Sequence, residues 1–148
     1  MEHLTPVKIL LVEDDPADQK LVKISLNEQK VANDLYIASN ANEALGYLRK
    51  CSANGNHSTR PDLILLDLNL PGMSGKEFLK EIKSDEELRS IPVVILTTSN
   101  SENDILESYN LQASGYVNKP VDIADFQDVI KQIENYWFVV CKRPISDR

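Results

Sequence analysis

Four short stretches of the chain end on side chains that could share one chemical task. One apolar run stops at Glu13 and Asp14, a second at Asp67, a third at Thr97, and a shorter one at Lys119. If these runs are parallel strands of one sheet, their carboxyl ends share an edge, where open α/β sheets place their binding sites. Three carboxylates, a hydroxyl and a lysine would then meet in one pocket. Such a set suits a divalent cation and a phosphoryl group carried by an aspartate.

Each of these residue types has a part in phosphorylation of an aspartate. The carboxylate of Asp67 can attack phosphorus, but it would be repelled by the phosphoryl oxygens unless a cation lies between them. Mg²⁺ removes that obstacle by bridging the two sets of oxygens, and Glu13 and Asp14 could bind it, one directly and the other through water. Lys119 offers a positive charge to the phosphoryl group, and Thr97 offers a hydroxyl donor. We therefore predict Mg²⁺ as the cofactor.

Each element also has an ordinary structural explanation when it is taken alone. Glu13 and Asp14 could be capping and surface charge, Asp67 could begin a turn, and Thr97 is a common strand residue. The pair Lys119-Pro120 is frequent in loops, and its peptide bond could be cis or trans. The order of these residues and their common placement at strand ends favour a shared site.

Composition and charge favour one compact domain and exclude several partners. The length of 148 residues is close to the commonest domain size, and the formal net charge of -7 argues against nucleic acid, whose phosphates would be repelled. No apolar stretch approaches the roughly 18 residues of a membrane helix, and the N-terminal residues lack a signal-peptide core. Cys51 and Cys141 are far apart, as in proteins with reduced thiols. We expect a cytoplasmic protein that binds neither nucleic acid nor membrane.

Strand and helix patterns alternate along the chain, which predicts parallel strands joined by crossover helices. The predicted strands cover residues 7–13, 35–38, 63–66, 92–97 and 115–118. The predicted helices begin after Asp15 and Asn40 and cover about 76–84, 104–110 and 122 to beyond Trp137. Leu21, Ile24 and Leu26 are predicted to face inward from the first helix. The expected fold is α/β: a doubly wound (βα)5 three-layer sandwich around a five-stranded parallel sheet.

The motifs taken together resemble those of the response-regulator receiver domains of two-component signalling. The matching segments are ILLVEDDP at 9–16, DLNLPGMSG at 67–75, LTT at 96–98 and GYVNKP at 115–120. The resemblance covers essentially the whole chain. It implies a flavodoxin-like strand order of 2-1-3-4-5 and a single receiver domain over residues 1–148. The core of that domain would cover about 6–135, and a C-terminal helical extension would cover about 136–148.

The resemblance also implies a role for each residue of the metal and acceptor site. Asp67 would be the phospho-acceptor, while Glu13 and Asp14 would hold Mg²⁺ with help from the backbone carbonyl of Asn69. Glu13 stands where many receivers have Asp. Such a domain catalyses only its own phosphorylation and dephosphorylation, so it is not expected to be an enzyme with a separate substrate.

A second group of residues matches the family's conformational switch. Thr97 matches the switch hydroxyl, and Lys119 matches the lysine that binds phosphate. Tyr116 matches the switch aromatic residue, whose ring rotates inward when the hydroxyl is drawn to the phosphate. Asn69 and Ser99 flank the pocket at positions where the family pattern suggests that they tune the entry of water.

A narrower resemblance concerns the polar loop at 52–60 and the ending ENYWFVV at 134–140. Both are similar to the small stand-alone regulators paired with cyanobacterial phytochrome histidine kinases. The implied donor is therefore a sensor histidine kinase of the phytochrome type. With no attached output domain, the signal would leave by protein contact.

Three other classes of protein are also considered. An Asp-dependent phosphotransferase or phosphatase would want a second Asp two positions after Asp67, where Asn69 stands. A flavodoxin-like cofactor binder would want a glycine-rich loop after the first strand, which this chain lacks. A receiver-like interaction module that is never phosphorylated is the remaining alternative.

The last predicted helix carries a clue about assembly. Its apolar residues recur at spacings of three and four, which predicts one buried stripe of Phe126, Val129, Ile130, Ile133, Trp137 and Val140. Tyr136, Phe138 and Val139 fall off that stripe. They could fold back on their own domain or pair with a second copy of the chain. We predict a homodimer that uses the fourth and fifth helices and this tail.

Overall fold

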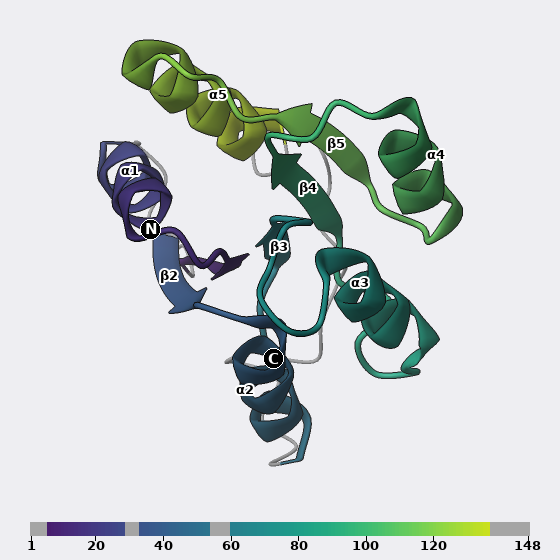
Figure 1. The fold of residues 1–148 in the computed structure, drawn as a ribbon. Helices are drawn as coiled ribbons and strands as arrows, with labels where there is room; N and C mark the ends of the chain where they lie inside the picture. The colour runs from purple at the N-terminus through teal and green to yellow at the C-terminus, as the bar shows by residue number, and fades with distance from the viewer. Residues whose placement is uncertain (1–5, 29–32, 54–59, 137–148) are drawn as a thin grey trace.

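A computed structural model describes residues 6–28, 33–53 and 60–136. In these ranges five strands alternate with five helices (Figure 1). The elements in chain order are β1 (Val7–Val12), α1 (Pro16–Asn27), β2 (Asn33–Ala38), α2 (Ala41–Ala53), β3 (Leu63–Leu66), α3 (Gly75–Ser84), β4 (Val93–Thr97), α4 (Glu102–Asn110), β5 (Gly115–Asn118) and α5 (Ile123–Asn135).

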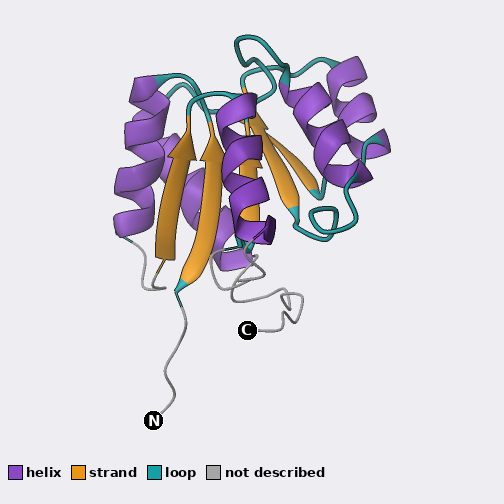
Figure 2. Ribbon diagram, turned by 90° about the horizontal axis from the view of Figure 1, so that it is seen from below, coloured by secondary structure: helices purple, strands orange, loops and turns teal. Residues whose placement is uncertain are grey.

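The strands form one sheet in the order β2-β1-β3-β4-β5, and all four pairings are parallel. Helices α1 and α5 cover one face of the sheet, while α2, α3 and α4 cover the other (Figures 1 and 2). The predicted doubly wound α/β fold and its strand order are therefore confirmed. Because every strand runs in the same direction, all five carboxyl ends lie at one edge of the sheet.

The core has two parts, one on each face of the sheet. Successive side chains of a strand point to opposite faces, so Leu10 and Val12 contact the α2–α3 side while Ile9 and Leu11 contact the α1–α5 side. All residues of β3 and β4 are buried. This burial on both faces explains why these strands read as unbroken apolar runs. The central strands are therefore rigid supports for the residues that follow them.

Helix starts follow the predicted capping residues. The Asp15 side chain accepts a hydrogen bond from the Ala17 amide at 2.9 Å, with Pro16 in the first helical position. The Asn40 side chain accepts from the Glu43 amide at 2.8 Å. Helix α4 begins two residues earlier than predicted because the Ser101 side chain caps it.

One inward-facing residue of α1 was predicted wrongly. Ile24 is 37% exposed, whereas Val22 and Leu26 are buried. Residues two apart on a helix lie on nearly opposite sides, while residues four apart share a face. The buried stripe of α1 therefore passes through Val22 and Leu26 and excludes Ile24.

Several predictions concern the chain ends and loops. The Lys119–Pro120 bond is trans, as are the other peptide bonds in the described ranges. On α5, Phe126, Ile130 and Ile133 are buried as predicted, while Trp137, Val140, Cys141 and residues 54–59 of the polar loop lie outside the described residues. No helix in the described part of the chain is long and apolar enough to cross a membrane.

Candidate functional site at the carboxyl edge of the sheet

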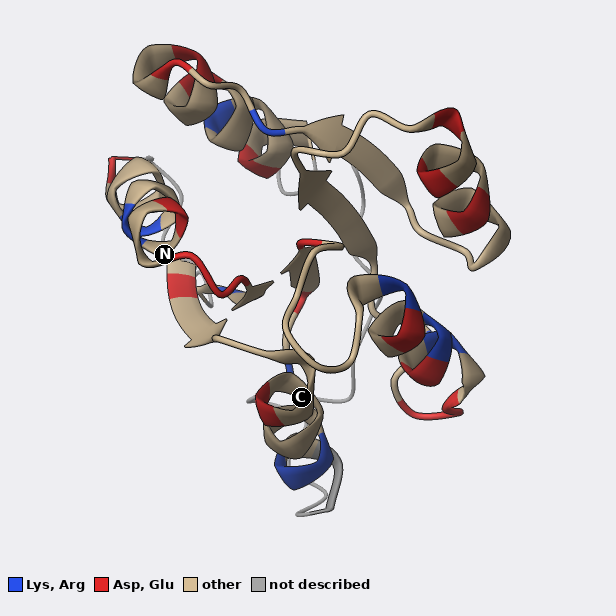
Figure 3. Ribbon diagram, viewed as in Figure 1, with Lys and Arg blue, Asp and Glu red and all other residues tan. Residues whose placement is uncertain are grey.

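In three strands, the backbone hydrogen bonding between neighbouring strands continues for one residue past the end of the strand. The Glu13 amide donates to the Ala38 carbonyl at 3.0 Å, the Asp67 amide to Val12 at 3.1 Å, and the Lys119 amide to Thr97 at 2.8 Å. These bonds fix the first residue after each strand next to its neighbouring strand. Figure 3 shows the acidic segments beside the ends of β1 and β3. The predicted residues therefore meet at one edge of the sheet.

Three carboxylates form the centre of the site. Glu13, Asp14 and Asp67 each offer an oxygen, and these oxygens all lie within 4.8 Å of one another. Glu13 and Asp67 are buried, while Asp14 is exposed. Two unit charges about 4 Å apart repel by about 4 kcal/mol at an effective dielectric constant near 20. Hard oxygen ligands at this spacing fit Mg²⁺, which would offset that repulsion.

Lys119 supplies the positive charge of the site. Its side chain is only 5% exposed, and its Nζ contacts Glu13 Oε1, Asp67 Oδ2 at 3.0 Å and Asp18 Oδ2 at 2.8 Å. Burial alone would lower the pKa of Lys119, but its hydrogen bonds to Asp18 and Glu13 outweigh that effect and raise it. The lysine therefore stays charged at neutral pH and contacts the Asp67 carboxylate directly.

Glu13 has an unusual acidity because of its position. Burial raises the pKa of Glu13 to about 7, although the hydrogen bond from Lys119 acts in the opposite direction. A cation that binds Glu13 near neutral pH must therefore compete with a proton.

Asp18 is the member of the site that the sequence did not predict. It lies in the first turn of α1, with a side chain that is 22% exposed, and it pairs with Lys119. Its position in the sequence could have indicated this. Pro16 fixes the start of α1, so Asp18 belongs to the first turn, close to the strand ends. Acidic residues are common in first turns, where they also favour the helix dipole. Because this explanation accounts for Asp18 by itself, nothing in the sequence required its contact with Lys119.

The remaining predicted residues lie around the acceptor. The Asn69 amide donates to Asp67 Oδ1 at 3.2 Å, while the use of its carbonyl as a metal ligand stays a prediction. Thr97 is fully buried at the end of β4. The Tyr116 ring packs against the core on the α2–α3 side, and its hydroxyl donates to the Ser99 carbonyl at 2.8 Å. The ring is therefore half-buried, with its hydroxyl on the loop that follows β4.

Of the three residues predicted to lie off the buried stripe and form the interface, Tyr136 alone falls within the described residues. Tyr136 is 53% exposed at the end of α5. Phe138 and Val139 lie outside the described residues.

The comparison with known proteins agrees with this geometry. Residues 9–131 match the family described as the response regulator receiver domain. The chain belongs to this family. Response regulator Rcp1 from Synechocystis sp. is 40% identical to this receiver domain over 145 residues, which cover 98% of each chain. Receiver domains are signalling modules rather than enzymes with a separate substrate.

Two solved structures of response regulators resemble this receiver domain. The phosphorylated cyanobacterial phytochrome response regulator RcpA has a TM-score of 0.87 at 41% identity, over 95% of this chain and 99% of that one. The Mn²⁺-bound form of Rcp1 has a TM-score of 0.85 at 39% identity, over 95% of this chain and 100% of that one. The predicted resemblance to phytochrome-associated regulators is confirmed.

Proposed function

We propose that this receiver domain accepts a phosphoryl group on Asp67 from a sensor histidine kinase, with Mg²⁺ as the cofactor. The observation that carries the proposal is the contact between Lys119 Nζ and Asp67 Oδ2 at 3.0 Å, beside two further carboxylates. A phosphorylated aspartate is anionic, so the buried lysine and a Mg²⁺ held by the clustered oxygens would each supply positive charge beside it. Similarity to a phosphorylated relative and to a Mn²⁺-bound one supports both parts.

The proposed transfer is a direct displacement at phosphorus. One oxygen of Asp67 attacks the phosphoryl group of a phosphohistidine, and the P–N bond breaks as the P–O bond forms. Mg²⁺ held by Glu13, Asp14 and Asp67, with the Asn69 carbonyl, would screen the charge between the carboxylate and the phosphoryl oxygens. Lys119 would then exchange part of its contact with Asp67 for the new phosphoryl oxygens.

The proposed switch uses the residues on β4 and β5. The Thr97 hydroxyl would donate to a phosphoryl oxygen, and the Tyr116 ring would rotate inward as Thr97 is drawn to the phosphoryl group. Phosphorylation would thereby shift the population of two surface conformations near α4 and β5. The changed surface would be read by another protein.

The proposed setting follows from the relatives. RcpA is described as a phytochrome response regulator, so we propose a phytochrome-type kinase as the donor. We also propose that the chain acts in the cytoplasm as one receiver domain over residues 1–148, with a core of about 6–135 and an extension of about 136–148.

Intact mass after incubation with acetyl phosphate and Mg²⁺ tests the proposed function. The wild-type chain should gain about 80 Da, the mass of one phosphoryl group, and Asp67→Asn should gain nothing. The Asn variant keeps the size of the side chain but loses the nucleophile. If beryllofluoride also fails to bind the wild type in the presence of Mg²⁺, the chain is better explained as an interaction module that is never phosphorylated.

We also propose that the chain forms a homodimer through α4, the end of α5 and the tail. Leu106 and Tyr109 on α4 are 60% and 49% exposed, and Tyr136 is 53% exposed. Removing the tail should therefore weaken the dimer. Sedimentation equilibrium of a chain that ends at Asn135 should give the monomer mass, while the Tyr36→Ser control, on the distant edge strand β2, should stay dimeric. An unchanged dimer mass for the shortened chain would contradict the proposal.

A further inference from the structure

Ser99 in the loop between β4 and α4 joins hydrogen bonds from three elements. Its carbonyl accepts from Tyr116 Oη and from Asn118 Nδ2, both at 2.8 Å. Its amide donates to Thr97 Oγ1 at 3.4 Å, and its hydroxyl donates to Asp104 Oδ2 on α4. One residue therefore connects the hydroxyl of Thr97, the ring of Tyr116 and the first turn of α4.

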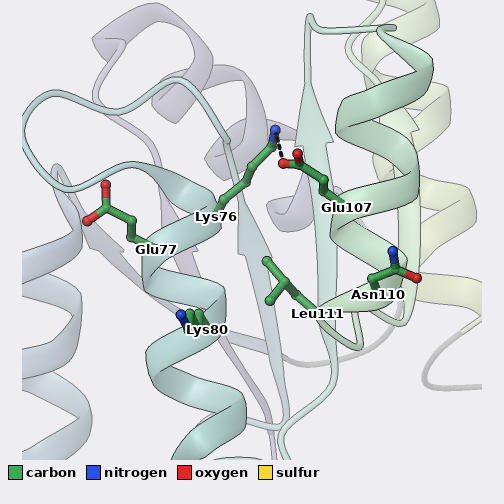
Figure 4. A pocket seen from close by; sticks show the side chains of 6 residues that line it. All are labelled: Lys76, Glu77, Lys80, Glu107, Asn110 and Leu111. Carbon is green, nitrogen blue, oxygen red and sulfur yellow. Dashed lines mark ion pairs between the residues drawn. The ribbon is translucent and has the colours of Figure 1, made fainter.

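Asp104 is held in turn by a lysine on α3. Lys76 Nζ forms an ion pair with Asp104 Oδ1 and a second one with Glu107 Oε2 at 2.6 Å. Figure 4 shows Lys76 reaching from α3 toward Glu107 on α4. The hydrogen bonds that Lys76 donates to Asp104 and Glu107 raise the pKa of Lys76, and the one that Asp104 accepts from Lys76 lowers the pKa of Asp104. The pair is therefore charged at neutral pH.

The two oxygens of Asp104 have different partners, and each partner orients the other. Oδ1 faces Lys76, which leaves Oδ2 directed at the Ser99 hydroxyl. Hydrogen bonds to a charged carboxylate are stronger than those between neutral groups. Without Lys76, the Asp104 carboxylate would be free to turn toward water. The Ser99 hydroxyl would then lose the partner that fixes the loop.

Packing between α3 and α4 does not replace this link. An open pocket of about 330 Å³ lies at the surface between parts of the two helices, and Figure 4 shows the side chains that line it. Its lining residues are Lys76, Glu77, Lys80, Glu107, Asn110 and Leu111. The side chains of Lys76 and Asp104 are each 27% exposed, so their charges are less screened by water than those of a fully exposed pair. The ion pairs of Lys76 with Asp104 and Glu107 therefore connect α3 to α4 beside this pocket.

Helix α3 also begins directly at the acceptor loop. Leu68 directly follows Asp67 in the chain. The Gly75 amide donates to the carbonyl of Leu68 at 3.0 Å. Lys76 is the next residue along α3. The lysine is therefore positioned by the same loop that carries Asp67, although its ion pairs within the described residues are with Asp104 and Glu107 on α4.

We propose that Lys76 is a positioning residue for the switch. Its ion pair with Asp104 holds Ser99 so that the Ser99 carbonyl receives the Tyr116 hydroxyl, which favours the inward position of the ring. The inference rests on the proposed switch role of Thr97 and Tyr116. It goes beyond that role because it assigns control of the switch to a residue on α3.

Fluorine NMR of the chain labelled with 3-fluorotyrosine tests this inference. The Tyr116 signal is assigned by its loss in Tyr116→Phe. Lys76→Met should lower the ratio of inward to outward ring by about fivefold, the size expected for a partly exposed charge pair, and Lys76→Arg should restore most of it. Lys80→Met, one turn further along α3, should leave the ratio unchanged. An unchanged ratio in Lys76→Met would overturn the inference.

A second variant separates this role from general damage to the fold. Asp104→Asn should shift the Tyr116 signal as Lys76→Met does, and the double variant should shift it no further because both remove the same link. Additive shifts would overturn the inference. Beryllofluoride binding with Mg²⁺ is a separate measurement, and a wild-type chain that does not bind it contradicts the proposed function. The ratio of inward to outward Tyr116 ring, measured without beryllofluoride, tests the role of Lys76.

Discussion

Replacing Gly75 with alanine is expected to destabilise the domain and to disturb the acceptor loop at the same time. A Cβ atom at Gly75 would lie 2.6 Å from Leu68 Cα and even closer to the carbonyl oxygen of Asp67. Both are backbone atoms, which cannot rotate away as the end of a side chain can. Helix α3 would have to move from the loop, at a cost of about 2 kcal/mol in the free energy of unfolding. Urea unfolding measures that cost, and the rate of phosphoryl uptake should fall with it.

Gly46 provides the matched control for Gly75. It also lies in a helix, but an added Cβ there would have no atom within 4 Å. Because alanine favours a helix more than glycine does, Gly46→Ala should raise the free energy of unfolding by roughly 0.5–1 kcal/mol. A Gly75→Ala variant as stable as the wild type would show that the helix can shift without cost, which would contradict the close approach.

Replacing Lys119 with methionine is expected to make stability depend strongly on Mg²⁺. The side chains of Glu13 and Asp67 are 3% and 8% exposed, and Lys119 is their shared positive partner. Removing one partner of a buried charge group leaves the others uncompensated, at a cost of about 3 kcal/mol. Protonation of Glu13 would offset part of this cost. In a chelator, Lys119→Met should therefore unfold at lower urea concentration than the wild type, and Mg²⁺ should recover much of the loss.

The controls for Lys119 separate charge from shape. Lys119→Arg keeps the positive charge, so its stability in a chelator should lie closer to that of the wild type. Lys119→Met should also lose phosphoryl uptake, because no cation from the chain would face the phosphoryl oxygens. If Mg²⁺ stabilises Lys119→Met no more than the wild type, the carboxylates are not the source of the lost stability.

Much of the fold, and the meeting of the candidate site residues at one edge of the sheet, could be predicted because their signals are local. Burial on both faces makes β3 and β4 continuous apolar runs, and each run ends where the chain leaves the sheet. The parallel arrangement then brings Asp67 and Thr97 to one edge without any knowledge of long-range contacts. Asp15 and Pro16 likewise marked the start of α1 from two adjacent residues.

The contacts that were not predicted depend on how separate helices pack. Asp18 reaches Lys119 across 101 positions in sequence, and Lys76 reaches Asp104 across 28. Neither pair has a sequence spacing that marks it, since acidic and basic residues are common on exposed helix faces. The rotation of each helix decides these contacts, and the misplaced Ile24 shows that a short apolar stripe leaves this rotation open.

Two sets of contacts near Asp67 run to opposite faces of the sheet. Lys119 leads to Asp18 on α1, on the face that α1 and α5 cover, while Ser99 leads to Asp104 on α4, on the other face. Under the proposed function, a change near Asp18 alters the lysine that holds the phosphoryl group. A change near Asp104 alters the surface that a protein partner recognises. The lifetime of the phosphoryl group and the choice of protein partner can therefore evolve through different substitutions.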